Sequence, residues 1–146
     1  TGAGAEMRRA LGTTVFSGSM RFRRETRITV DLFQVELDTA IEVAGATLSA
    51  GTRISRDSYV QSETFALAAD GSLRVENTTG ELLFANERVF TAFNFLPQPY
   101  TGGMKLFGQG GSTIEVAATE TFELRIDSDL DADGDVDEST TTSWPL

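Results

Sequence analysis

Apolar and polar side chains alternate along most of this chain, and this pattern constrains its fold more than any other feature. Residues 26–32 and 121–126 show the alternation clearly. A β-strand points successive side chains to opposite faces, so a period of two predicts strands with one apolar face. Turn signals recur about every 8–12 residues, which is typical of antiparallel strands in a sandwich or barrel. We therefore expect a single all-β domain over residues 1–146, an antiparallel β-sandwich or barrel.

Local signals predict where the strands bend or end, and one segment where helix replaces strand. Residues 1–12 are expected to form a short helix or a flexible N-terminal tail, and their lack of an apolar stretch suggests a trimmed, mature start. The predicted breaks are a bulge or bend at Leu32-Phe33, a two-residue hairpin turn at Asp70-Gly71, a loop at Pro97 and Pro99, and a tight turn at residues 108–111.

The absence of two residue types narrows the chemistry. The chain has no cysteine and no histidine, which excludes a cysteine nucleophile, a Ser-His-Asp triad and a zinc site built on Cys or His. A carboxylate-based glycoside hydrolase stays open as an alternative. Its candidate acids are Glu63, Glu76, Glu81 and Glu87. Their spacing selects no pair, so we expect no enzyme and assign no catalytic residue.

Charge is strongly acidic overall and unevenly distributed. The net charge of −10 disfavours a nucleic-acid partner, which needs a basic surface. No run of about 18 apolar residues occurs, so no transmembrane segment is expected. Half of the 12 basic residues fall within the first 27 positions: Arg8, Arg9, Arg21, Arg23, Arg24 and Arg27. Two interpretations remain, a solvated strand face or a docking surface for an acidic partner or for the acidic end of another copy.

Acidic residues gather near the other end, in the stretch DSDLDADGDVDEST. Asp129, Asp131 and Asp133 are spaced by two and Gly134 follows, so the pattern D-x-D-x-D-G is complete. Calcium prefers about 6–8 oxygen ligands, and alternate carboxylates converge when such a segment curls. Acidic side chains this close together also repel one another unless a cation or solvent screens them. The sequence therefore predicts a calcium loop over residues 129–138, with a solvated acidic turn as the alternative.

This stretch resembles the EF-hand-like calcium loops that lie between non-helical elements in exported bacterial β-proteins. The resemblance covers about a dozen residues, and Thr140 stands where an EF-hand has its closing glutamate. The resemblance implies that Asp129, Asp131 and Asp133 bind Ca²⁺ through their carboxylates and Asp135 through its main-chain carbonyl. Asp137, at a position that often binds through water, and Glu138 complete the expected ligands. Because calcium is scarce in the cytosol, we expect an extracytoplasmic location, either periplasmic, cell-surface or secreted.

Phenylalanine is abundant, with 10 residues against two tyrosines and one tryptophan. Core packing explains most of them. An apolar ligand cavity is the functional alternative, and residues 90–96 are the best place for it because Phe occurs there on both parities.

These features lead to a non-enzymatic structural or assembly module. We expect an exported β-domain, stabilised by calcium, that belongs to a larger envelope or surface complex. Its expected partner is another protein or a second copy, and the opposite charges of its two ends favour head-to-tail contact. The alternatives are a carrier for an apolar small molecule in a β-barrel and the glycoside hydrolase.

Overall fold

The computed structural model describes residues 20–78 and 80–145, so the predicted helix or tail at residues 1–12 lies outside the described part. The described residues form eleven strands and one 3-10 turn, η1 (Gln109–Gly111). The strands are β1 (Met20–Thr26), β2 (Val30–Leu37), β3 (Ile41–Val43), β4 (Ala46–Leu48), β5 (Arg53–Tyr59), β6 (Thr64–Val75), β7 (Leu82–Phe93), β8 (Leu96–Phe107), β9 (Thr113–Ala118), β10 (Glu123–Asp129) and β11 (Glu138–Ser143). In this part of the chain, no helix has the length and apolar character needed to cross a bilayer.

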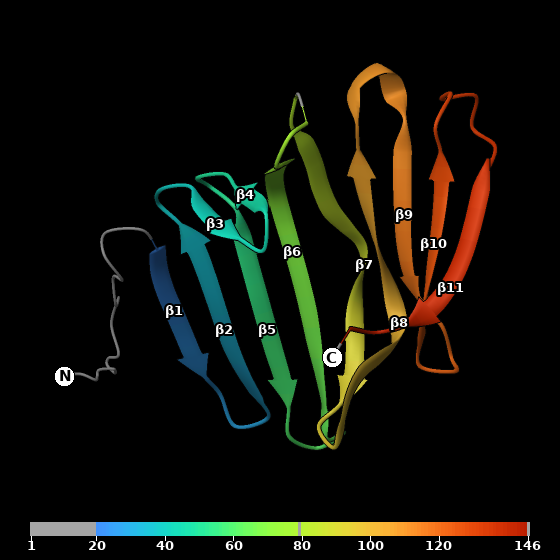
Figure 1. The fold of residues 1–146 in the computed structure, drawn as a ribbon. Coiled ribbons are helices and arrows are strands. Elements are labelled where there is room, and N and C mark those ends of the chain that lie inside the picture. Colours follow the sequence, from blue (N-terminus) through green and yellow to red (C-terminus); the bar gives the residue numbers. More distant parts are fainter. Residues whose placement is uncertain (1–19, 79, 146) are drawn as a thin grey trace.

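All strands belong to one antiparallel sheet, so the all-β prediction is confirmed (Figure 1). The order is β1-β2-β5-β6-β7-β8-β9-β10-β11, and the small β3–β4 hairpin joins the sheet through the pairing of β4 with β6. The sheet does not close into a barrel. Among the described residues, β1 and β11 end the strand order and each pair with a single neighbour, and the three-residue strand β3 also pairs only with β4.

The two faces of the sheet differ in chemistry. Directly paired residues of antiparallel strands lie on the same face, so the register assigns each side chain to a face. The apolar face carries Phe33, Val35, Leu37, Ile54, Phe65, Leu67, Phe84, Phe90, Met104, Leu106, Ile114, Val116, Leu124 and Ile126. The polar face carries mainly charged and hydroxyl residues, among them Arg21, Gln34, Glu36, Arg53, Asp70, Lys105, Glu115 and Asp127.

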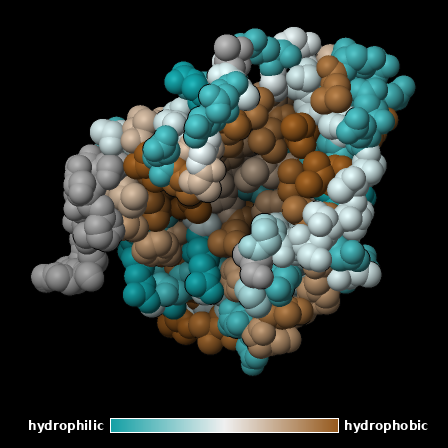
Figure 2. Space-filling model, viewed as in Figure 1, coloured by the Kyte–Doolittle hydropathy of each residue, from teal (hydrophilic) through white to brown (hydrophobic). Residues whose placement is uncertain are grey.

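The apolar face holds most of the buried core. Leu37, Phe65 and Phe84 are each at most 7% exposed. Figure 2 shows hydrophobic side chains gathered in a hollow over the middle of the sheet. The chain returns toward β7 after β11 (Figure 1), and the Trp144 ring meets Phe90 edge-on with 5.7 Å between centroids. This contact joins the C-terminal end of the described chain to the middle of the sheet.

The predicted hairpin at Asp70-Gly71 is wrong, because β6 runs through both residues without a turn. The glycine at position 71 instead lets Thr52 lie close to the β6 backbone. A Cβ atom at this position would lie 2.4 Å from Thr52 Oγ1, and Thr52 is only 1% exposed. A glycine inside a strand often marks such an approach of another backbone.

The predicted bulge at Leu32-Phe33 is also wrong. β2 pairs with β1 and with β5 without any shift of register there. Leu32 lies on the polar face beside Asp57, and Phe33 lies on the apolar face beside Arg56. An inner strand that is half-buried on both faces can carry apolar residues of both parities, so no phase change is required.

The predicted loop at Pro97 and Pro99 is wrong as well, because β8 begins at Leu96 and includes both prolines. The turn before it is formed by Asn94 and Phe95. β9 pairs with β8 only from Gly103 onward. The prolines therefore stand where β8 lacks a partner on one side, and a missing N–H costs no ladder bond there. The tight turn predicted at residues 108–111 is confirmed as η1.

The real irregularity of the sheet lies where β6, β7 and β8 meet. Register shifts between Leu67 and Asp70 on β6, and beside Asn86 on β7. The Asn86 amide fills this gap. Its Oδ1 accepts a hydrogen bond from the Ala69 N–H at 2.6 Å, and its Nδ2 donates to the carbonyls of Arg88 and Gly103 at 3.1 and 3.2 Å. One side chain thus satisfies main-chain groups that the bulge leaves without ladder partners.

Replacing Asn86 with alanine should lower the free energy of unfolding by about 1–3 kcal/mol, because these main-chain groups lose their partners in a half-buried site. Urea denaturation measures the effect. Asn94→Ala is the matched control, since Asn94 is exposed and the substitution keeps its main-chain N–H, which donates to the Glu63 carbonyl at 2.8 Å. A loss for Asn86→Ala no larger than that of the control would contradict this role.

Gly71→Ala should also destabilise the sheet, by about 1–3 kcal/mol, because the new methyl group overlaps the buried Thr52 side chain. Gly103→Ala is the control. Its Cβ would find its nearest neighbour at 3.5 Å, an ordinary contact. Thermal unfolding of the two variants should separate them clearly, and equal melting temperatures would show that Thr52 can move aside.

Candidate metal centre

The acidic loop joins β10 to β11 at one end of the sheet. Ser128 and Glu138 form the last pair of the ladder, and the Asp137 N–H donates to the Ser128 carbonyl at 2.8 Å. The loop therefore lies between two strands rather than two helices, as the alternation on its flanks predicted. It also lies beside η1, since a Cβ at Gly111 would be 3.2 Å from the Ala132 Cβ.

Asp129 organises the loop through main-chain donors. Its Oδ1 accepts from the Ala132 N–H at 2.7 Å, and its Oδ2 accepts from the Gly134 N–H at 2.9 Å. Ala132 and Gly134 have positive φ, at 65° and 97°. Glycine adopts this conformation without strain, so Gly134 serves the sharp turn for which the D-x-D-x-D-G pattern reserves it.

Further carboxylates bind main-chain N–H groups across the loop. Asp137 Oδ2 accepts from Leu130 at 2.6 Å, which ties the end of the loop to its start. Asp131 Oδ1 accepts from Asp133 at 3.3 Å, and Asp133 Oδ1 accepts from Asp135 at 2.8 Å. These bonds curl the segment so that several carboxylates face one another.

The curl brings three carboxylates together. One oxygen each from Asp129, Asp131 and Asp137 lies within 4.8 Å of the others. A calcium ion holds its oxygens at about 2.3–2.6 Å, so two ligands on opposite sides are about 4.6–5.2 Å apart. The group therefore fits within one calcium coordination sphere. A carboxylate oxygen that accepts one hydrogen bond keeps a lone pair for a metal, and main-chain carbonyls and water would complete the shell.

The remaining predicted ligands lie outside this group. Asp133 belongs to the same loop, but its carboxylate is not among the three that converge. The main-chain carbonyl predicted for Asp135 is not a carboxylate ligand, so its role stays a prediction. Glu138 is the first residue of β11. Asp127 lies on β10, where it accepts from Arg125 Nε at 2.8 Å and from Ser139 Oγ at 2.5 Å. Ser139 is also its partner in the ladder, so this hydrogen bond supports the pairing of β10 with β11.

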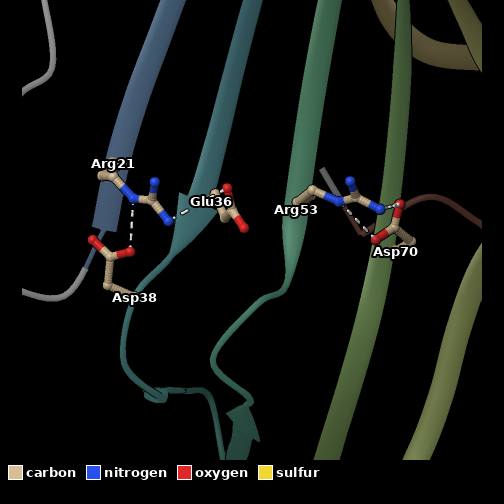
Figure 3. A network of polar contacts seen from close by, with 5 residues as sticks. All are labelled: Arg21, Glu36, Asp38, Arg53 and Asp70. Carbon is tan, nitrogen blue, oxygen red and sulfur yellow. Dashed lines mark hydrogen bonds and ion pairs between the residues drawn. The ribbon is translucent and has the colours of Figure 1, made fainter.

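The arginines near the start of the described chain pair with acids on the same sheet. Arg21 contacts Asp38 at 2.7 Å and Glu36 at 3.6 Å, and on β5 Arg53 contacts Asp70 at 3.2 Å (Figure 3). Further along β1, Arg24 makes two hydrogen bonds to Asp31, at 2.7 and 3.1 Å.

These pairs help to decide whether the arginines of the first 27 positions form a solvated strand face or a docking surface. The hydrogen bond from the Arg24 guanidinium lowers the pKa of the Asp31 carboxyl below its ordinary value. The partners are half-exposed, so each pair contributes little stability. Acids of the same sheet offset the charge of this region, which favours a solvated face over a docking surface. Arg8 and Arg9 lie outside the described residues.

The aromatic residues of the β7–β8 turn pack on one another. Phe93 stacks on Phe95 and on Tyr100, with 5.2 and 4.7 Å between centroids, and Tyr100 meets Phe122 edge-on at 6.2 Å. Phe95 remains 74% exposed. A depression of about 400 Å³ opens elsewhere and is lined by Gln34, Arg53, Ser55, Ala68, Ala69, Asp70, Ala85, Asn86, Glu87 and Val89. Its charged rim does not suit an apolar ligand.

Two glutamates of the hydrolase alternative lie far apart, and two others pair with residues of the sheet. Glu63 and Glu76 flank the two ends of β6, about 40 Å apart at 3.3 Å per residue. Glu87 pairs with Lys105 at 3.3 Å, and Glu81 accepts from Ser49 at 3.0 Å. A retaining glycosidase holds its two carboxyl groups about 5–5.5 Å apart, and an inverting one about 6.5–9.5 Å apart. The Glu63–Glu76 separation far exceeds both.

Comparison with known proteins adds no family. No protein-family model matches the chain, and neither the curated proteins nor the solved structures contain a significant match.

Asp129→Ala should destabilise the metal-free protein by about 1–2 kcal/mol, because the Ala132 and Gly134 N–H groups lose a charged acceptor. Urea denaturation in EDTA measures this. Asp135→Ala removes the same charge, and the loop's hydrogen bonds use only the main-chain N–H of that residue. It should be neutral or slightly stabilising, since it relieves repulsion. Equal losses for the two variants would rule out a special role for Asp129.

Proposed function

We propose that this chain is a non-enzymatic structural or assembly module of a larger extracytoplasmic complex, with a calcium ion holding its β10–β11 hairpin. One observation carries the proposal: within residues 20–78 and 80–145 the sheet is open, its end strands β1 and β11 each pair with one neighbour, and part of its apolar face is uncovered. On that face, Phe33 is 39% and Ile54 is 42% exposed. Free edges and uncovered apolar surface are features that association buries.

The converging carboxylates support the calcium part of the proposal. Asp129, Asp131 and Asp137 supply hard oxygen ligands, and the loop lies between two strands of a fixed ladder. Such a site suits a stabilising clip rather than a sensor, because the strands give it no helices to move. Extracellular calcium modules bind at about 10⁻⁴–10⁻³ M, and this range fits an extracytoplasmic location.

Calcium at millimolar concentration should raise the melting temperature, because an ion that binds only the folded state stabilises it by mass action. Calorimetry with CaCl₂ or EDTA measures the shift. Asp137→Asn should abolish most of it, because Asp137 belongs to the converging group.

Asp133→Asn is the matched control, since it removes the same charge from the same loop and keeps an oxygen that can accept from Asp135. It should retain most of the calcium effect. If both variants respond alike, the ion is only screening the acidic loop as a whole. If wild type does not respond, the loop is a solvated turn.

The assembly part of the proposal is tested by measuring whether the protein associates with itself or with a partner. Size-exclusion chromatography with light scattering, run over a range of concentrations with calcium and with EDTA, should show self-association or binding to a partner from the same envelope fraction. A protein that stays monomeric and unpartnered in every condition would count against the proposal.

A carrier of an apolar molecule is the second candidate, and the hollow of the apolar face favours it (Figure 2). Native mass spectrometry of freshly purified protein distinguishes the two. A retained ligand of constant mass would support the carrier, and bare protein would support the module.

A further inference from the structure

We propose that β11 is a self-pairing edge, on which a second copy of this chain adds its own β11 antiparallel to form a two-fold dimer with a continuous sheet. This inference rests on the proposed function and names its partner and surface. The first observation is the edge itself. All six residues of β11 are exposed, and within the described chain β11 pairs only with β10.

The two end strands of the sheet, β1 and β11, differ in their protection against pairing with another strand. Natural proteins guard edge strands with charged side chains, prolines or bulges. β1 carries Arg21, Arg23 and Arg24, and so it is guarded by charge. In β11, residues 139–143 are all serine or threonine, and no shift interrupts the pairing with β10. The third strand with a single neighbour, β3, has only three residues and carries Glu42. Among the described strands, the long edge without a guard is therefore β11.

Symmetry and side-chain pairing together favour one register, because a two-fold axis must pass through a residue of β11 and the axis at Thr141 pairs the most hydroxyl residues. A two-fold axis perpendicular to the sheet pairs residues of the same face. Thr140 and Thr142 lie on the apolar face with Ile126 and Leu124, while Ser139, Thr141 and Ser143 lie on the polar face. With the axis at Thr141, Thr141 meets its own symmetry mate, Thr140 meets Thr142, and Ser139 meets Ser143. Every pair then joins two hydroxyl side chains, a favourable cross-strand combination.

Charge favours the antiparallel direction between two copies. In this register the two Glu138 residues are six positions apart along the strands, about 20 Å at 3.4 Å per residue. That exceeds a Debye length of about 8 Å, so the two acidic loops are screened from each other. Parallel pairing would place them side by side, at about 4.8 Å.

A β1–β11 contact between copies has less support. It would bring β11 against the charged β1 edge, whose Arg21 and Arg24 already pair with Asp38 and Asp31. A head-to-tail contact of this kind also grows into an open chain of subunits unless its rotation closes a ring. The β11 pairing closes at two copies.

A cysteine placed on the axis tests the register, because the chain has none of its own. Thr141→Cys should form an intermolecular disulfide under mild oxidation, since directly opposed residues have Cβ atoms about 4.5–5.5 Å apart, close to disulfide geometry. Ser139→Cys is the control on the same strand and face. Its symmetry mate lies four positions away, about 14 Å along the strand, so it should stay monomeric.

Thr141→Lys tests the interface without a cross-link. Two lysines would then face each other at the axis, and the dimer dissociation constant should rise about tenfold or more. Thr29→Lys is the charge-matched control, at an exposed position in the β1–β2 turn. Sedimentation equilibrium measures both variants, and circular dichroism checks that each one folds.

The outcomes separate this inference from the proposed function. Rapid cross-linking of Thr141→Cys alone, with weakened association of Thr141→Lys, supports the β11 dimer. Equal cross-linking at both cysteines, or association that Thr141→Lys leaves unchanged, overturns it while leaving the assembly module standing. A wild-type chain that never associates overturns both.

Discussion

The separation of side chains onto two faces of one sheet is the constraint on which the rest of this structure depends. The register places Phe65, Leu67 and Phe90 on one face and ion pairs such as Arg53–Asp70 on the other. A single sheet with one apolar face must cover that face or expose it. Here the returning Trp144 covers part of it, at Phe90. Within the described residues, the exposed remainder and the unpaired sides of β1 and β11 are the surfaces on which the proposed contact with other molecules rests.

The shape of the acidic loop is set by its own hydrogen bonds and by the two strands that it joins. The β10–β11 ladder fixes both ends of the loop, and Asp129 binds two main-chain N–H groups at its centre. The same bonds that curl the backbone also gather like charges, which costs free energy unless a cation offsets it. A divalent ion between Asp129, Asp131 and Asp137 would turn that repulsion into a bond between the two strands. Such an ion would link the acidic loop to the order of β11, the strand that we propose as the contact edge.

Much of the fold could be predicted from the sequence, because alternation is a local property. The β character of the chain and the position of the acidic loop between strands both follow from it. The pairing partners could not be predicted in the same way. Asp70-Gly71 has a hairpin signal, yet its glycine serves a contact with Thr52, which lies 19 positions away in the chain. Pro97 and Pro99 fit inside β8 only because β9 does not reach them. Both features depend on residues that are distant in the sequence and close in space, so local patterns could not predict them.

The candidate site shows the same division. The spacing of Asp129, Asp131 and Gly134 predicted a curled acidic segment, and the structure contains one. The selection of Asp137 over Asp133 depends on the left-handed Ala132 and on the bond from Leu130 to Asp137. The spacing of the acidic residues predicts neither this backbone conformation nor this hydrogen bond. The role of the Asn86 amide was not predicted for a related reason. Its hydrogen bonds depend on an irregularity that three strands form together.

The most direct test of the calcium-clip account is a crystal structure grown with calcium and measured for anomalous scattering. We expect one peak in the acidic loop, about 2.3–2.6 Å from carboxylate oxygens of Asp129, Asp131 and Asp137. A peak held by Asp133 and Asp135 instead, or a well-ordered loop with no peak at millimolar calcium, would contradict it.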